Sequence, residues 1–428
     1  MKFFWLLFFL GLATGVLLSP VFAVVIFLVP LVFLKRIETK VLAFAVIIGA
    51  ILGIRSVLPG SYEMIGFVTQ VRARSVIATD VMIWKDNKWM RLKHNVQVNS
   101  DELPLGYDFY AYGEIESRVG YPAYVLMPHF SQSTRRTLQG FEKLRAYLFI
   151  WRERFQQLLQ KTLKDKAQIA ESLFFSQRTL DDNLSSAVKR SGLSHVFAVS
   201  GLHVAIVYGF LEILVSIFTY RMIPRRIITT ILTMLYALST GPTPSALRAA
   251  MMLMIWNVFK IMDYPVHPLN VLGLVGTANV FLEPYSVLSP SFLMSYSGTG
   301  AIVLLTQKLS KKRLLQPLVV SASAFIGVSP FISLLYGLNP LSPIFSIPAI
   351  YIATLCLCGL ALGSIVNLLG MIGLSEMLLK GTYPFLTFLE HLIHFASVFS
   401  FTLKPNIVAY IFCCAFLLIL FWHFLHNP

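Results

Sequence analysis

The feature that most constrains this chain is a series of long apolar segments, interrupted by one charge-rich block. Apolar segments occur at about 3–19, 21–34, 41–58, 194–218, 227–241, 245–262, 265–282, 286–306, 317–336, 342–366, 382–402 and 405–426. Spanning the hydrocarbon core of a bilayer takes about 20 residues of helix, so the shorter segments must pair, tilt or re-enter. The pattern predicts a membrane all-α fold, a polytopic helical bundle of about 10–12 membrane segments.

Composition agrees with a membrane protein. The chain is 56% apolar and only 13% charged, with a mean hydropathy of +0.72. An ordinary soluble domain carries about 25% charged residues, so that class is excluded. Residues 61–190 hold 19 Lys and Arg and 14 Asp and Glu, more than half of all the charges. This block is therefore expected to be aqueous and the remainder to lie in the membrane.

Three basic clusters predict the orientation. They are Lys35, Arg36 and Lys40; Arg221, Arg225 and Arg226; and Lys308, Lys311, Lys312 and Arg313. If each apolar segment crosses once, all three fall on one side, which the positive-inside rule makes the cytoplasm. Residues 61–190 are then extracytoplasmic. The first 23 residues imitate a secretory signal peptide, but the apolar run continues to Leu34, so we expect retained helices.

The charge-rich block begins with a strand pattern and ends with a helical one. Several short runs between residues 61 and 135 are rich in β-branched and aromatic residues, which favours a small, OB-like β-barrel. From 141 to 166 the apolar residues share one helix face, which predicts an amphipathic helix on the membrane surface or one packed on the barrel. The expected regions are 1–58, N-terminal membrane helices; 61–135, the β domain; 141–190, an amphipathic or interfacial helical linker; and 191–428, a large membrane domain.

Polar residues in three apolar segments predict the lining of a membrane cavity. These residues are His195, Ser200, Gly201, His203, Pro244, Ser245, Arg248 and Ser295. An Arg at the centre of a membrane helix costs about 2.5–3.5 kcal/mol, so it normally faces a polar cavity or snorkels to the interface. Helix-breaking prolines are tolerated only beside protein or water. The alternative for any one small or polar residue is ordinary helix–helix packing.

A basic hairpin in the β domain has residue types that would suit single-stranded nucleic acid. Its cations are Arg72, Arg74, Lys85, Lys88, Arg91 and Lys93, against Asp80 and Asp86. Trp84 and Trp89 flank the turn. Cations attract phosphates and aromatic rings stack on bases. The alternative is a solvated hairpin with core tryptophans. The four cysteines lie in apolar runs and predict packing, and no metal or cofactor site is expected.

The segment from Ser191 to Val204 resembles the signature of the ComEC family of competence proteins. Glu171 to Leu180 is similar to the approach to that motif, and Pro244, Ser245, Arg248 and Ala249 match a second element. The stretch from Pro284 to Tyr296 is similar to a third element of the family, although this chain has Leu293 where family members commonly have Gln. The resemblance implies an inner-membrane channel, not an enzyme, that translocates single-stranded DNA into the cytoplasm during natural transformation. The chain resembles the short form, which lacks a C-terminal metallo-β-lactamase-like nuclease domain.

The resemblance also implies partners. Moving a phosphate into a negative-inside cell costs about 2.3 kcal/mol per 100 mV, and the sequence has no Gly-x-x-x-x-Gly-Lys-Ser/Thr phosphate loop. We expect a separate helicase-like ATPase, cytoplasmic DNA-binding proteins, a separate nuclease and a periplasmic DNA receptor. Membrane lipid is an expected partner, and a homo-oligomer is compatible with a channel. Two alternatives stay open: an intramembrane serine hydrolase using Ser200 and His203, and a transporter of a small anion or envelope precursor.

Overall fold

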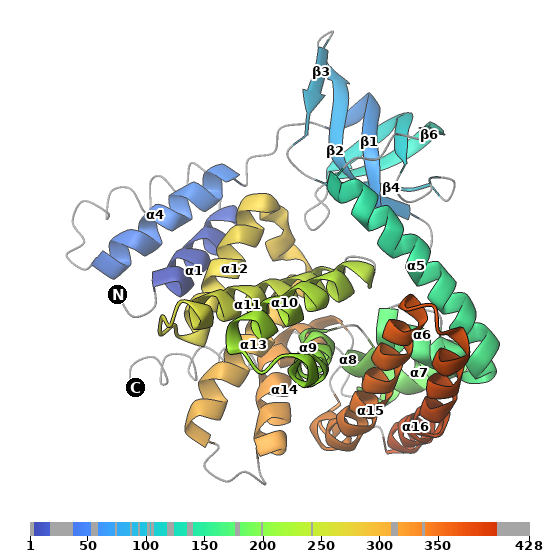
Figure 1. Cartoon of the computed structure of the whole chain (residues 1–428). Helices are drawn as coiled ribbons and strands as arrows, with labels where there is room; N and C mark the ends of the chain where they lie inside the picture. Colours follow the sequence, from blue (N-terminus) through green and yellow to red (C-terminus); the bar gives the residue numbers. More distant parts are fainter. Residues whose placement is uncertain are drawn as a thin grey trace. The chain divides into compact units, whose positions relative to one another are not determined.

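A computed structural model describes most of the chain (Figure 1). The described residues are 4–17, 37–52, 59–72, 75–85, 88–92, 95–100, 103, 107–117, 124–134, 140–175, 180–197, 200–240, 243–309, 316–335 and 339–399. The chain divides into two compact units, Met1–Ala146 with Val266–Phe292, and Tyr147–Pro265 with Leu293–Pro428. Each unit is described by itself.

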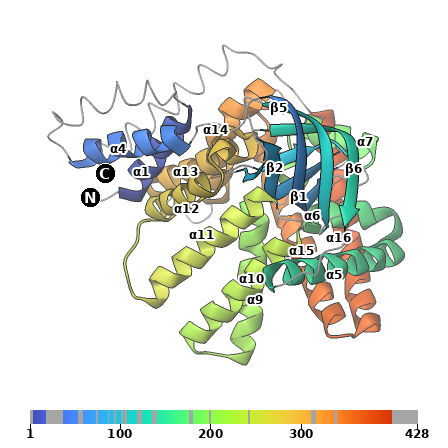
Figure 2. The same cartoon turned by 90° about the horizontal axis from the view of Figure 1, so that it is seen from above.

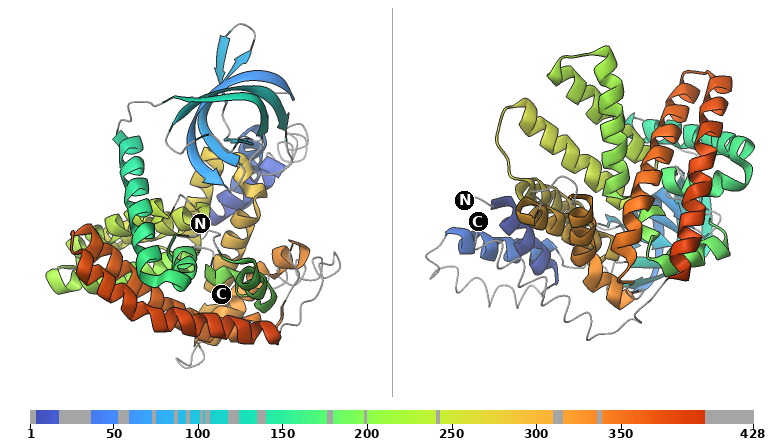
Figure 3. Two further views of the ribbon diagram at one scale, coloured as in Figure 1. Left: turned by 90° about the vertical axis from the view of Figure 1, so that its right-hand side faces the viewer. Right: turned by 90° about the horizontal axis from the view of Figure 1, so that it is seen from below.

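The first unit contains a closed β-barrel. Its strands are β1 (Gly60–Arg72), β2 (Ser75–Lys85), β3 (Lys88–Arg91), β4 (Val96–Val98), β5 (Asp108–Ser117) and β6 (Tyr124–Thr134). The strand order is β1-β5-β6-β4-β2-β3, and an additional β1–β2 pairing closes five strands into a ring with β3 as an extension of β2. All pairs are antiparallel except β4–β6. Figure 2 and Figure 3 show the strands curving around a common interior. This order is that of an OB-like barrel, as the strand pattern predicted.

Alternation along the strands fills the barrel. On β5 the buried residues Phe109, Ala111 and Ile115 alternate with residues that face outward. Tyr285, from the short helix η3 (Pro284–Leu288), is buried in the same core. The backbone N–H of Asn95 donates to Glu283 Oε2 at 3.0 Å, just before η3. The barrel is thus completed by a segment about 150 residues further along the chain, which no local pattern predicts.

The described part of the first unit also contains three long apolar helices. They are α1 (Phe4–Leu17), α4 (Ile37–Leu52) and α12 (Pro268–Leu282). A Cβ at Gly49 of α4 would overlap the backbone of Leu12, and one at Gly276 of α12 would meet the ring of Phe9. Glycines at these crossings let helix backbones approach closely, as in membrane helix pairs. The expected segment 21–34 lies outside the described residues.

The second unit is helical, and two of its helices, α5 and α13, begin in the first unit. Its elements are α5 (Gly140–Leu163), η2 (Lys164–Lys166), α6 (Ala167–Phe175), α7 (Asp182–Ser191), α8 (Ser194–Phe197), α9 (Gly201–Phe218), α10 (Met222–Ser239), α11 (Pro244–Ile261), α13 (Pro290–Leu309), α14 (Gln316–Leu335), α15 (Ser342–Leu368) and α16 (Ile372–Val398). Figure 3 shows α15 and α16 side by side as a long hairpin. Proline in the first turn of α11, α12 and α15 fits its fixed φ and missing N–H, which explains why these helices begin there.

The apolar face of α5 is covered by protein of its own unit. Phe155, Leu159 and Leu163 are buried in the same core as residues of α6, α7, α15 and α16. Ion pairs reinforce this packing, because Lys161 Nζ lies 2.8 Å from Glu376 Oε1 and Lys166 Nζ lies 2.6 Å from Glu390 Oε2. The sequence suggested the membrane surface or the barrel as partner of this face. The partner in the structure is the α6–α7 and α15–α16 helices.

Two of the helices in the described part of the chain, α9 and α15, are long and apolar enough to cross a membrane. Shorter apolar stretches are Phe4–Thr14, Pro268–Leu282 and Gln316–Ile332. The segment 405–426 and the basic residues Lys311, Lys312 and Arg313 lie outside the described residues. The total of 10–12 membrane segments therefore stays a prediction.

Candidate functional site

The predicted apolar segment 194–218 is divided into α8 and α9 before Ser200. Ser200 is the N-cap of α9, because its Oγ accepts a hydrogen bond from the backbone N–H of Leu202 at 3.3 Å. In return, His203 Nδ1 accepts from the backbone N–H of Ser200 at 3.3 Å and lies 3.2 Å from Ser200 Oγ. This reciprocal arrangement is a capping box, and it buries the His203 ring. The three-residue spacing of Ser200 and His203 therefore encodes a helix start.

Arg248 is buried in the helix bundle. It lies in the second turn of α11 and is only 3% exposed. Its Nε donates to Ser295 Oγ on α13 at 3.4 Å, and its Cζ lies 5.8 Å from the centroid of the Tyr296 ring. A cation over an aromatic face is attracted by the ring quadrupole, more strongly when desolvated. The side chain therefore faces protein and does not snorkel.

The starts of α9 and α11 are in contact. A Cβ at Gly201 would lie 3.5 Å from the Cβ of Ala249, the residue after Arg248. Since Arg248 also contacts α13, the three polar elements predicted from the sequence meet around the first turns of α11. Ser245 is half-buried and Pro244 exposed at the start of the same helix. Pro242 lies outside the described residues.

His195 links the first motif to a different helix. Its Nδ1 lies 3.2 Å from the carbonyl oxygen of Gly192, and its Nε2 lies 3.2 Å from Ser346 Oγ on α15. Ser342 Oγ, one turn earlier on α15, donates to the same Gly192 oxygen at 2.9 Å. The His195 side chain thus helps to fix the turn before α8 against α15, whereas Ser200 and His203 organise the start of α9.

A polar network that the sequence reasoning missed joins α9, α10 and α11. Asn257 Nδ2 donates to Thr230 Oγ1 at 2.9 Å, and the hydroxyl of Tyr208 donates to Asn257 Oδ1 at 3.2 Å. Asn257 is buried. A lone Asn in the apolar run of α11 was the available signal, since an amide buried there must find partners. The network fixes the helices that carry His203 and Arg248.

A buried carboxyl group lies just before the first motif. Glu171 on α6 is 3% exposed and accepts a hydrogen bond from Gln160 Nε2 at 3.0 Å. Burial raises the pKa of Glu171, opposed by the Gln160 hydrogen bond and the charge of Arg152. Burial also lowers the pKa of Arg152 to about 10, opposed by Glu171 and Glu153. The hydrogen bond from Gln160 to Glu171 joins α5 to α6.

On the barrel, the predicted hairpin presents its tryptophans to solvent. Trp84 and Trp89 are cross-strand partners on β2 and β3, with ring centroids 5.4 Å apart in an edge-to-face arrangement. Each is 39% exposed, so neither is a core residue. Lys85 and Lys88 form the next cross-strand pair. The end of the hairpin therefore combines two rings and two cations.

The other predicted cations of the barrel differ in setting. Arg91 is exposed and forms an ion pair with Asp80, which neutralises part of its charge. Arg72 is the last residue of β1, where the backbone pairs with Ser75. Arg74 and Lys93 lie outside the described residues.

Strands β5 and β6 carry a second aromatic group that the sequence reasoning missed. The rings of Tyr110 and Phe130 have centroids 6.4 Å apart, and those of Tyr112 and His129 lie 6.1 Å apart. Phe130 is 52% exposed and Tyr112 is also exposed. We call these four residues the β5–β6 aromatic patch. The alternation of buried and outward residues along β5 was the signal that places Tyr110 and Tyr112 outside the barrel.

Comparisons with known proteins agree with these features. The sequence model of the Competence protein family matches residues 173–426, which is more than half of the chain and includes the elements around Arg248. The protein is thus a member of the class of competence proteins. The chain belongs to the ComEC family of competence proteins, as the sequence motifs predicted. Family membership supports a role in DNA uptake.

Two curated relatives match part of the chain. An uncharacterized protein of Aquifex aeolicus (strain VF5) is 28% identical over 199 residues, 45% of this chain and 46% of the relative. ComE operon protein 3 of Bacillus subtilis (strain 168) is 28% identical over 188 residues, 43% of this chain and 24% of the relative. The matches thus span less than half of the length of either relative. No solved structure matches.

Proposed function

We propose that this protein is a multi-pass inner-membrane channel that carries single-stranded DNA into the cytoplasm, with residues 61–190 outside. The observation that carries the proposal is the burial of Arg248 where α9, α11 and α13 meet, at the residues that define the family resemblance. A cation buried among apolar helices is costly and marks a substrate or ion pathway by default.

The chemistry of Arg248 suits a phosphate backbone. A guanidinium is planar, keeps its charge and presents N–H donors in a fork that matches two phosphate oxygens. The guanidinium lies 5.8 Å from the centroid of the Tyr296 ring, and its Nε donates to Ser295 Oγ. Each phosphate that passes would lose hydrating water, and its attraction to the guanidinium would offset part of that desolvation cost. The barrier to entering a low-dielectric region would therefore be lower.

The barrel supplies a second part of the proposal. Exposed aromatic rings with nearby cations bind single strands with little sequence preference, at about 1–3 kcal/mol per stacked base. The Trp84–Trp89 pair and the β5–β6 aromatic patch offer such rings on the strands of an OB-like barrel. The barrel would hold the incoming strand before it enters the membrane part of the chain.

Transport against the membrane potential needs further proteins. The proposal includes a separate helicase-like ATPase and DNA-binding proteins on the cytoplasmic side, because each phosphate must be moved at a cost of about 2.3 kcal/mol per 100 mV. It also includes a separate nuclease and a periplasmic DNA receptor. A homo-oligomer is compatible with this arrangement.

The hydrolase alternative makes a different prediction for Ser200. Helix capping accounts for the proximity of Ser200 and His203, and it needs only a side-chain acceptor. Asn caps helices as well as Ser does but is no nucleophile. If capping is its role, Ser200→Asn keeps DNA uptake while Ser200→Ala lowers it modestly. A hydrolase would lose all activity in both variants.

The experiment that tests the proposed function uses a deletion strain and labelled duplex DNA. We expect DNA to reach the nuclease-protected outer compartment, while no label enters the cytoplasm and no transformants form. The gene on a plasmid should restore both. Normal transformation in the deletion strain would overturn the proposal, and loss of small-anion or precursor transport with normal DNA uptake would favour the transporter alternative.

A further inference from the structure

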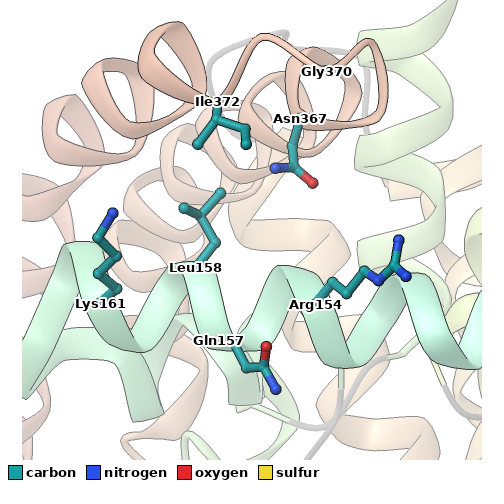
Figure 4. Close-up of a pocket in the computed structure, with 7 residues that line it drawn as sticks. All are labelled: Arg154, Gln157, Leu158, Lys161, Asn367, Gly370 and Ile372. Carbon is teal, nitrogen blue, oxygen red and sulfur yellow. The ribbon is translucent and has the colours of Figure 1, made fainter.

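A pocket of about 380 Å³ lies between α5 and the turn that joins α15 to α16 (Figure 4). It is lined by Arg154, Gln157, Leu158, Lys161, Asn367, Gly370 and Ile372. All of these residues belong to the second unit. Gly370 has a φ of +80°, which only glycine adopts readily, and nothing within 4 Å would meet a side chain there. The turn is therefore tight and leaves the pocket open.

The polar groups of the pocket suit an anion. Arg154 and Lys161 are two helical turns apart on α5, and Figure 4 shows both extending toward the α15–α16 turn. Lys161 is held by Glu376 at 2.8 Å, whereas Arg154 is exposed and forms no ion pair with any described residue. The amides of Gln157 and Asn367 add neutral donors. The charges around the pocket thus leave one positive charge, centred on Arg154.

The residues beside the pocket are apolar and exposed. Leu368 and Leu369 at the end of α15 are 68% and 70% exposed, and Met371 and Ile372 at the start of α16 are 52% and 55% exposed. We call these four residues the apolar tip. Consecutive large aliphatic side chains in water are unfavourable, at about 25 cal/mol per Å² of apolar surface. Apolar side chains next to a cation are typical of proteins that insert into the membrane interface, where the cation meets lipid phosphate.

We propose that this pocket binds the head group of an anionic phospholipid, with Arg154 on its phosphate and the apolar tip among its acyl chains. Nucleic acid is disfavoured as the occupant, because the tip has aliphatic side chains and lacks the aromatic rings on which bases stack. The site goes beyond DNA transport, since it requires only that the chain contact a membrane.

The site also restricts the topology. The Lys161–Glu376 and Lys166–Glu390 ion pairs require α5, η2 and the part of α16 up to Glu390 to lie on one side of the membrane. Single crossings of every apolar segment would instead separate residues 141–190 from residues 367–381. If the first basic cluster, Lys35, Arg36 and Lys40, is cytoplasmic and segment 41–58 crosses once, the pocket faces the outer leaflet of the inner membrane.

The test measures lipid binding by the purified full chain in a neutral detergent. Phosphatidylglycerol, phosphatidylcholine, inorganic phosphate and a single-stranded oligonucleotide are titrated separately, and thermal stability reports binding. We expect phosphatidylglycerol to raise the Tm and phosphatidylcholine to have little effect. Arg154→Gln should lower the affinity for phosphatidylglycerol about tenfold or more, because a charge-assisted hydrogen bond is lost. The matched control is Lys164→Gln, an exposed cation of the adjoining helix η2 outside the pocket.

A second pair of variants tests the apolar tip. A double variant that carries Leu368→Ser and Leu369→Ser should bind phosphatidylglycerol more weakly. Its Tm in the absence of lipid should be unchanged, since both side chains are exposed. Equal weakening by Lys164→Gln, or no response to phosphatidylglycerol, would overturn the proposal. If inorganic phosphate raises the Tm as much as the lipid does, the pocket is a phosphate site. If the oligonucleotide does so, the pocket is a nucleic-acid site. Either result would overturn the lipid-binding proposal. Normal lipid binding in a chain that transports no DNA would overturn only the proposed function.

Discussion

Replacing Arg248 by Met separates a transport role from a structural one. Met is close to Arg in length but carries no charge. The change removes the contact with the Tyr296 ring, worth about 1–2 kcal/mol in a desolvated setting, and a long hydrogen bond to Ser295. It also removes the cost of burying a guanidinium, about 2.5–3.5 kcal/mol at the centre of a membrane helix and less near its end. The two terms oppose each other, so we expect the stability to change by about 1 kcal/mol or less.

Transport should respond much more strongly. A charge-assisted hydrogen bond to phosphate is worth about 1.5–3 kcal/mol, and its loss in the rate-limiting step lowers the rate about 10- to 150-fold. The assay compares uptake of labelled DNA and transformation frequency in cells that carry wild type, Arg248→Met or Arg248→Lys. The Lys variant keeps the charge but not the planar fork, so it should fall in between. Arg221→Gln, an exposed cation before α10, is the control.

The amount of folded protein in the membrane fraction and its Tm are measured for each variant. Uptake at the wild-type rate in Arg248→Met would remove Arg248 from the path of DNA. A loss of uptake that merely follows a loss of folded protein would instead make Arg248 a structural residue, and the reasoning from its burial would be wrong.

Three further predictions concern stability and binding. Because burial raises the pKa of Glu171 in the folded state, its ionisation opposes folding. The contribution of Glu171 to stability should therefore fall as pH rises above the ordinary Glu value. Measured as Tm between about pH 4 and 7, Glu171→Gln should gain stability relative to wild type as the pH rises, and parallel pH profiles would contradict this. Trp84→Ala in the full chain should weaken binding of a single-stranded oligonucleotide by about 1–3 kcal/mol in fluorescence anisotropy, whereas unchanged affinity would exclude the hairpin. Gly276→Leu should destabilise the first unit by about 1–3 kcal/mol or more through overlap with Phe9, and an unchanged Tm would show that α1 and α12 do not pack as described.

Local patterns predicted much of the fold. Alternating strands between 61 and 135 predicted the barrel, because period-2 burial is a local property that each strand shows by itself. The pairing that closes the barrel brings β1 against both β2 and β5, and the burial of Tyr285 beneath it joins segments about 150 residues apart. Such contacts leave no periodic trace in the sequence, so they were not predictable from it.

The candidate site shows the same division. The sequence singled out Arg248 and the Ser200–His203 pair because a cation or a polar pair in an apolar helix is costly and therefore rare. It did not show that Ser200 caps α9, because residues 194–218 were read as one continuous segment and Ser200 as part of a cavity lining. The β5–β6 aromatic patch was missed because tyrosine fits both a barrel core and a barrel surface, and only strand register decides which.

The sequence by itself determined the class of the protein, its polar intramembrane residues and the starts of several helices, because hydropathy, charge and proline act over a few residues. Tertiary structure alone decided which of these residues meet. Arg248 and Ser295 are 47 positions apart, and Lys161 and Glu376 are 215 positions apart. Burial of a shared apolar core brings such residues together, and the energy of that burial depends on complementary shapes of whole helices.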